Sequence, residues 1–117
     1  MGNAVTHFEI NGRNGKALGE FYAKAFDWHV DSNNPMNYCM VDTHAGKGIN
    51  GGIGTPPDGS SSVTVYIETD DLEATLAKIE KLGGKTVNPP MELPGSGVTL
   101  AHFADPEGHV IGLAKGM

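Results

Sequence analysis

Two segments of alternating residues carry side chains that can exchange protons with a small molecule. Residues 5–10 alternate like a β-strand, so His7 and Glu9 lie on one face. The same alternation over 63–69 puts two further polar side chains on one face. Imidazole, phenol and carboxylate groups act as general acids and bases. We therefore predict a catalytic group formed by His7, Glu9, Tyr66 and Glu68.

Each of these groups also has a structural interpretation. A single strand histidine is most often hydrogen-bonded within the fold, and most glutamates reach solvent at a rim. A neutral hydroxyl shares the face of Tyr66, and polar or flexible side chains occur near the other predicted strands. We predict that a ligand contacts Thr64, Asn50 and Met40.

Hydrophobic periodicity divides the chain into two similar halves. The first half predicts a strand at 5–10, a helix at about 16–26 and short strands at 28–31, 38–43 and 49–54. The second predicts a strand at 63–69, a helix from Leu72 that ends at Gly83, and strands at 85–87, 98–103 and 109–114. Asp70 and Glu73 have the spacing of a capping box at the second helix.

The two halves predict one α+β domain over residues 1–117, built from two βαβββ modules at 4–54 and 63–115. The Pro-, Gly- and Ser-rich segment 55–62 reads as the linker. A shift of 57 residues matches Phe8 to Val65 and Tyr22 to Ile79. We expect the modules to form a curved mixed sheet with both helices outside and a concave cup for a ligand.

The composition argues against several classes of binding partner. The formal charge of −6 repels phosphate backbones and anionic lipid, so we expect no nucleic acid or membrane partner. A single cysteine, Cys39, cannot form an intrachain disulfide. Residues 1–25 lack the pattern of a secretion signal, and no apolar run approaches a membrane span. We expect a soluble, cytoplasmic protein.

Several short motifs together resemble one known superfamily. These are FY in the first predicted helix, GG after the second, and AHFADPEGHVIGL near the end, on the repeated βαβββ plan. The chain resembles the vicinal-oxygen-chelate superfamily, which contains glyoxalase I, bleomycin-resistance proteins and extradiol dioxygenases. The resemblance covers essentially the whole chain and implies a homodimer whose sheet edges are covered by a twin chain. It does not select a reaction.

Metal-dependent members hold a cation with His and Glu from the first and last strand of each module. His7 falls in the first-strand ligand column, but the matching position of the second module is Thr64. The resemblance places the family's final glutamate at Gly112, which has no side chain to coordinate a metal. In GINGGIG only Asn50 is a polar candidate. A stable catalytic site normally needs about three protein ligands, so we predict neither a metal nor another cofactor.

The other candidate residues favour structural interpretations. His102 and His109 flank the DPEG turn, where histidines are usually surface residues, and His29 and His44 show no partner of ligand type. Cys39 reads as a buried small hydrophobe. The glycines of Asn50-Gly51-Gly52 are better explained by close strand packing than by a phosphate loop, because neither phosphate-loop pattern is present.

Three functions stay open at this point. The first is an enzyme of unassigned reaction that binds a small organic molecule in the cup and transfers protons, for example on a carbonyl compound. The second is a non-catalytic protein of the bleomycin-resistance type that sequesters a small molecule. The third, a metal-dependent lyase or dioxygenase, requires that metal be found.

Overall fold

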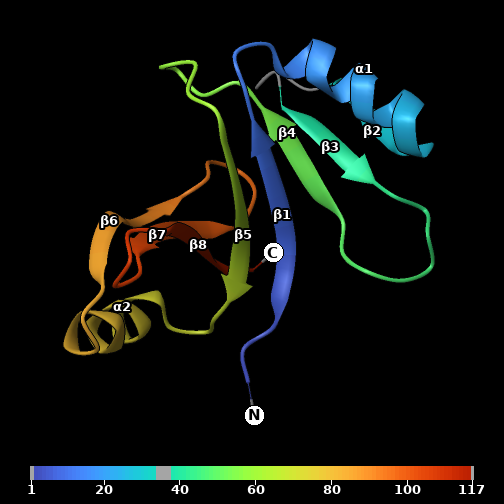
Figure 1. Cartoon of the computed structure of the whole chain (residues 1–117). Coiled ribbons are helices and arrows are strands. Elements are labelled where there is room, and N and C mark those ends of the chain that lie inside the picture. The colour runs from blue at the N-terminus through green and yellow to red at the C-terminus, as the bar shows by residue number, and fades with distance from the viewer. Residues whose placement is uncertain (1, 34–37, 117) are drawn as a thin grey trace. The chain divides into compact units, whose positions relative to one another are not determined.

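The computed structural model describes residues 2–33 and 38–116 and shows two βαβββ modules (Figure 1). The first module contains β1 (Val5–Asn11), α1 (Gly15–Phe26), β2 (His29–Asp31), β3 (Cys39–Asp42) and β4 (Gly51–Gly54). The second contains β5 (Ser62–Glu68), α2 (Leu72–Lys81), β6 (Lys85–Glu92), β7 (Thr99–Ala104) and β8 (Val110–Lys115). The predicted α+β fold with a repeated βαβββ plan is confirmed.

The chain clusters into two compact units, which we describe separately. The first unit comprises His7–Thr64, and the second comprises Met1–Thr6 together with Val65–Met117. The N-terminal segment joins the second unit because Asn3 donates to the Glu68 carbonyl at 3.0 Å and the Glu68 amide donates to the Ala4 carbonyl at 2.8 Å. Among the described residues, no helix is long and apolar enough to cross a membrane.

In the first unit the strands follow the order β2-β3-β4-β1, with β1 and β4 parallel and the other pairs antiparallel. Helix α1 begins where the Asn14 side chain accepts a hydrogen bond from the Ala17 amide at 3.1 Å. Its apolar stripe packs on one face of this sheet, over a core of Cys39, Val41 and Ile53. Cys39 is 2% exposed, which confirms its interpretation as a buried small hydrophobe.

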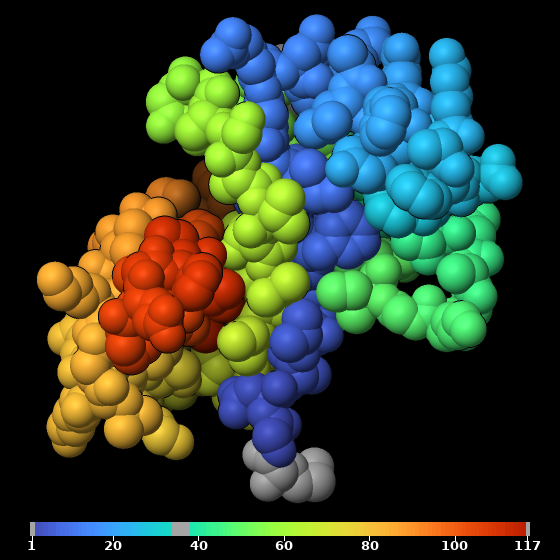
Figure 2. Space-filling view, in the orientation of Figure 1, coloured from blue at the N-terminus to red at the C-terminus, as the bar shows by residue number. Residues whose placement is uncertain are grey.

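In the second unit the strand order is β5-β8-β7-β6, and α2 packs Leu72 and Leu76 against Ala101 and Leu113. The cap of α2 differs from the predicted one. Asp71, not Asp70, is the N-cap, because its backbone is extended and its side chain accepts from the Ala74 amide at 3.0 Å. In Figure 2, α1 (blue) and α2 (gold) each contribute side chains to the surface of their own unit.

Strand β6 is longer than the sequence predicts, because it continues through Pro89 and Pro90 instead of stopping at Val87. Proline cannot donate to a sheet ladder, so it is tolerated only at edges and bulges. Both conditions hold here, since β6 is the outermost strand of its unit and its pairing with β7 is irregular between Asn88 and Met91.

Candidate functional site

The polar face of β1 carries the first part of the candidate site. Strand alternation places His7, Glu9 and Asn11 on the face opposite the α1 core, into which Phe8 and Ile10 pack. The strand register sets Glu9 beside Gly52 of β4, which in turn pairs with Met40 of β3. Directly paired residues of neighbouring strands share a face, so these residues line one surface of the first unit.

A chain of hydrogen bonds connects the polar residues of this face. The Tyr38 hydroxyl lies 3.0 Å from Nε2 of His7 and donates to Oε2 of Glu9 at 3.0 Å. The second carboxylate oxygen of Glu9 accepts from Nδ2 of Asn11 at 2.9 Å. Asn11 also donates to the Ser62 hydroxyl at 3.4 Å. Tyr38, which is not among the predicted site residues, therefore connects the side chains of His7 and Glu9.

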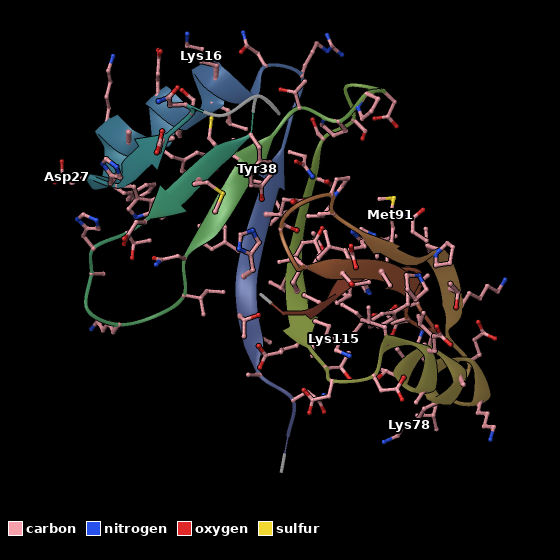
Figure 3. All side chains as sticks on the ribbon, turned by 180° about the vertical axis from the view of Figure 1, so that it is seen from behind. Lys16, Asp27, Tyr38, Lys78, Met91 and Lys115 are labelled. Carbon is pink, nitrogen blue, oxygen red and sulfur yellow. The ribbon has the colours of Figure 1, made fainter. Side chains whose placement is uncertain are left out.

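Glycine at position 52 makes room for this tyrosine. A Cβ atom built on Gly52 would overlap the Tyr38 hydroxyl and ring, and one on Gly54 would lie 3.0 Å from Tyr38 Cδ1. The phenol ring thus lies flat over β4 and reaches toward β1, as the labelled side chain in Figure 3 shows. Gly51 faces the other way, against Phe8. Close packing is therefore the reason for the glycines of β4, which confirms the expectation from the sequence.

The hydrogen bonds fix which atoms of this chain carry hydrogens. A carboxylate can only accept, so the single hydroxyl hydrogen of Tyr38 goes to Glu9. The hydroxyl oxygen then accepts from His7, which requires a hydrogen on Nε2. Burial lowers the pKa of His7, and the negative charge of Glu9 opposes this only in part. His7 is accordingly neutral near pH 7, and Nδ1 is its basic nitrogen.

The second unit contains a related polar row. The register pairs Tyr66 with Gly112, Gly112 with His102, and His102 with Asn88, so the row crosses all four strands. The Tyr66 hydroxyl lies 2.9 Å from Nε2 of His102, and Nδ1 of His102 lies 3.2 Å from Nδ2 of Asn88. A Cβ on Gly112 would overlap the Tyr66 ring. Glycine between the two partners lets the phenol and imidazole meet above it.

Two histidine interpretations from the sequence are wrong. His102, expected at the surface beside the DPEG turn, is instead half-buried in β7, and its Nε2 lies 2.9 Å from the Tyr66 hydroxyl. His29 and His44 are exposed as expected, yet they do have partners: their rings stack with centroids 5.6 Å apart, and Nε2 of His44 lies 3.2 Å from Asp42. The two histidines lie 15 residues apart in the sequence. They meet because His29 of β2 pairs with Asp42 of β3, which is two residues before His44.

The remaining predicted site residues lie in varied environments. Glu68 is exposed, and in the described part of the chain its carboxylate makes no hydrogen bond or ion pair. Thr64 is half-buried at the end of the first unit. Met40 is 52% exposed on the Tyr38 face. Asn50 lies just before β4, where its side-chain oxygen accepts from the Thr43 amide at 3.0 Å, so it closes the loop between β3 and β4.

A groove of about 800 Å³ opens at the start of α1, close to the end of this hydrogen-bond chain. Its wall includes the apolar side chains of Leu18 and Phe21 and the charged side chain of Arg13. Asn11 and Ser62, the last two members of the hydrogen-bond chain, also line it. The hydrogen-bond chain that begins at His7 thus ends at a surface that a small molecule can contact.

Three comparisons relate this architecture to known proteins. The family model described as a glyoxalase-like domain matches residues 7–114. The chain belongs to this glyoxalase-like family. The match spans both modules and confirms the resemblance to the vicinal-oxygen-chelate superfamily, with a reaction that stays unassigned.

Individual relatives of this glyoxalase-like chain differ in activity. The anthracycline biosynthesis protein DnrV of Streptomyces peucetius is 44% identical over 45 residues, which cover 38% of this chain and 16% of that protein. A methylmalonyl-CoA epimerase of Streptomyces coelicolor, in complex with 2-nitronate-propionyl-CoA, has a TM-score of 0.63 at 17% identity, covering 95% of each chain. The Mn(II)-bound glyoxalase of Novosphingobium aromaticivorans has a TM-score of 0.67 at 16% identity, covering 95% of this chain and 37% of that one. At these identities the two structures show a shared fold only.

The residues of this glyoxalase-like chain do not fit the metal site of metal-dependent members. By register Gly52 is the equivalent of Gly112, because Glu9 pairs with the first and Tyr66, 57 positions later, pairs with the second. Both positions lack a ligand side chain, and in both a tyrosine ring fills the space. Among the described residues, no group of three or more His, Cys, Asp or Glu side chains is arranged to hold a metal.

We therefore expect elemental analysis of the purified protein to find well below one zinc, manganese, iron or nickel ion per chain. The reason is geometric: positions 52 and 112 are glycines without a ligand side chain, and the rings of Tyr38 and Tyr66 fill the space beside them. A tightly bound metal near one equivalent per chain, retained through dialysis, would contradict this expectation and restore the metal-dependent candidate.

Proposed function

We propose that this chain binds a small organic molecule on the polar face of β1 and exchanges protons with it through His7, Tyr38 and Glu9. The observation that carries the proposal is the continuous hydrogen-bond chain from His7 through Tyr38 to Glu9. A ligand with an acidic C–H bond next to a carbonyl fits this chemistry. The base removes that proton, the ligand becomes an enolate, and return of the proton to carbon completes the cycle.

The arrangement suits His7 to act as a base and Glu9 to present a carboxylate of fixed orientation. Neutral His7 donates from Nε2 to Tyr38, so the basic lone pair of its ring is on Nδ1. Glu9 has both oxygens held, one by Tyr38 and one by Asn11, so its carboxylate has a fixed orientation. Pre-organised groups of this kind lose little free energy when a reaction begins. Small-molecule ligands of relatives, such as the CoA compound bound by the epimerase, agree with a ligand-binding function.

A screen of small carbonyl compounds by ligand-observed NMR, followed by C–H exchange in D₂O, tests the proposal. For a compound that binds, we expect Glu9→Gln to weaken affinity about fivefold, on the order of 1 kcal/mol, through loss of one charged contact. We expect His7→Gln to abolish exchange while the fold is retained. The matched control is Glu20→Gln on the exposed side of α1.

The outcomes separate the candidate functions. Equal affinity and equal exchange in the wild type and both variants would contradict the proposal. Binding without any exchange in the wild type favours the sequestering candidate, which the mismatch with the metal site also supports.

Other expectations from the sequence also stay predictions. Tyr66 and Glu68 are proposed to face the same ligand as His7 and Glu9, and shifts of all four residues in the NMR spectrum on ligand addition would support this. The homodimer and the cytoplasmic location are proposed on the resemblance and on the single, buried thiol of Cys39.

A further inference from the structure

The groove at the start of α1 combines apolar side chains with one cation. In Figure 1 the end of β1, the start of α1 and the segment before β5 lie at the same end of the first unit. Phe21 and Val63, which line the groove, are 60% and 75% exposed, and the half-buried Ile10 and Leu18 line it as well. Large exposed apolar side chains that gather in a concavity mark a surface that binds another molecule.

Arg13 is the charged residue of this groove and the single arginine of the sequence. A Cβ atom built on Gly59 would lie 3.9 Å from its Cγ, so the stem of Arg13 lies beside the loop before β5. Among the described residues its guanidinium makes no hydrogen bond or ion pair, and none of those that line the groove is acidic. A guanidinium without a carboxylate of the protein can bind the carboxylate of a ligand through two parallel hydrogen bonds.

Two uncharged side chains of the groove also present hydrogen donors. Oδ1 of Asn14 accepts from the Ala17 amide, which leaves its Nδ2 hydrogens to donate. The Ser62 hydroxyl accepts from Asn11, so its own hydrogen is directed elsewhere. Within the described part of the chain neither donor has an acceptor. The polar side of the groove therefore suits a negatively charged oxygen acceptor.

We infer that this groove is a binding site for a small amphipathic carboxylate, whose apolar body lies against Phe21 and Val63 and whose carboxylate pairs with Arg13. The inference goes beyond the proposed function, because it requires neither proton transfer nor His7. A second copy of the chain fits this surface less well. In a two-fold interface centred on the groove, the arginines of both copies would approach each other, with no acidic side chain among the described lining residues to separate them.

Titration with octanoate and with its uncharged analogue octanamide, followed at the backbone amide signals in NMR, tests the carboxylate contact. In the wild type we expect octanoate to shift the signals of residues 10–21 and 61–63, and octanamide to bind about three- to fivefold more weakly. Arg13→Gln should weaken octanoate binding by the same factor and leave octanamide binding unchanged. The matched control is Lys24→Gln, which removes an exposed cation of α1 outside the groove and should change neither affinity.

Phe21→Ala tests the apolar contact. We expect it to weaken the binding of both probes about fivefold, because both bury the same hydrocarbon body. Phe26→Ala is the matched control, since Phe26 lies on the same helix, is 59% exposed and is not among the residues that line the groove. It should keep the wild-type affinities.

Three results would overturn the inference: no octanoate binding by the wild type, shifts confined to other parts of the chain, or equal affinities for octanoate and octanamide. Light scattering tests the second copy as occupant. A wild-type dimer that Phe21→Ala converts to a monomer, together with no octanoate binding, would show that a twin chain covers the groove. Failure of the proposed function is distinguishable, because proton exchange is measured with His7 and Glu9 variants, and His7→Gln should keep the wild-type affinity for octanoate.

Discussion

Replacement of Gly112 by Ala should destabilise the folded protein by about 1–3 kcal/mol, the usual cost of overpacking a core. The added Cβ would overlap the inner part of the Tyr66 ring, and Tyr66 is 3% exposed and hydrogen-bonded to His102, so it cannot swing aside cheaply. Chemical denaturation with fluorescence detection measures the free energy of unfolding. Gly2→Ala is the neutral control, because nothing lies within 4 Å of the added methyl group there.

A double-mutant cycle isolates the contact with Tyr66. Tyr66→Ala alone should cost about 3–5 kcal/mol as a large-to-small core change. Adding Gly112→Ala to that variant should cost little further, because the ring that the methyl group meets is gone. Additive costs, with no coupling energy, would show that the strain lies in the backbone of β8 and not in the tyrosine.

Gly52→Ala should behave differently, although its added Cβ also meets a tyrosine. The overlapping atoms belong to the far end of Tyr38, which is half-buried and can move away. The smaller stability cost should therefore be accompanied by loss of the hydrogen bonds to His7 and Glu9. The two glycines occupy equivalent register positions. Gly112 leaves room for the buried ring of Tyr66, whereas Gly52 leaves room for Tyr38 of the candidate site.

The order of elements was accessible from the sequence because it depends on local patterns. Alternation in 5–10 and 63–69 and the helical stripes that begin near Leu18 and Leu72 follow directly from which residues are apolar. The offset of 57 residues also proved physically meaningful, since it relates Glu9 to Tyr66 and both pair with a glycine of a final strand.

The partners of the site could not be predicted, because they depend on contacts between distant strands. Tyr38 lies 29 residues from Glu9, and although the predicted strand 38–43 contains it, alternation within one strand does not show which neighbouring strand its ring covers. His102 lies in the predicted strand 98–103, but its place beside the DPEG turn favoured a surface interpretation, and strand alternation does not show that Tyr66 is its partner. A useful signal was present nonetheless: a glycine in a final strand leaves space that a large polar side chain can occupy.

The stability of the protein should fall as the pH is lowered from 7 toward 5, in part because of His7. In the unfolded chain His7 binds a proton near its ordinary pKa of 6.5, whereas burial lowers the pKa in the folded state. Between these two values unfolding takes up a proton, so the free energy of unfolding decreases as the pH falls below about 6.5. The limiting slope for one proton is about 1.4 kcal/mol per pH unit.

His7→Gln removes this proton uptake and keeps a side-chain amide near Tyr38, so the variant should lose less stability than the wild type over the same pH range. The comparison uses the slopes of unfolding free energy against pH, which separates the titration of His7 from any constant cost of the substitution. If the slopes of the wild type and His7→Gln coincide, His7 titrates alike in both states. The neutral imidazole on which the proposed proton exchange depends would then have no support from burial.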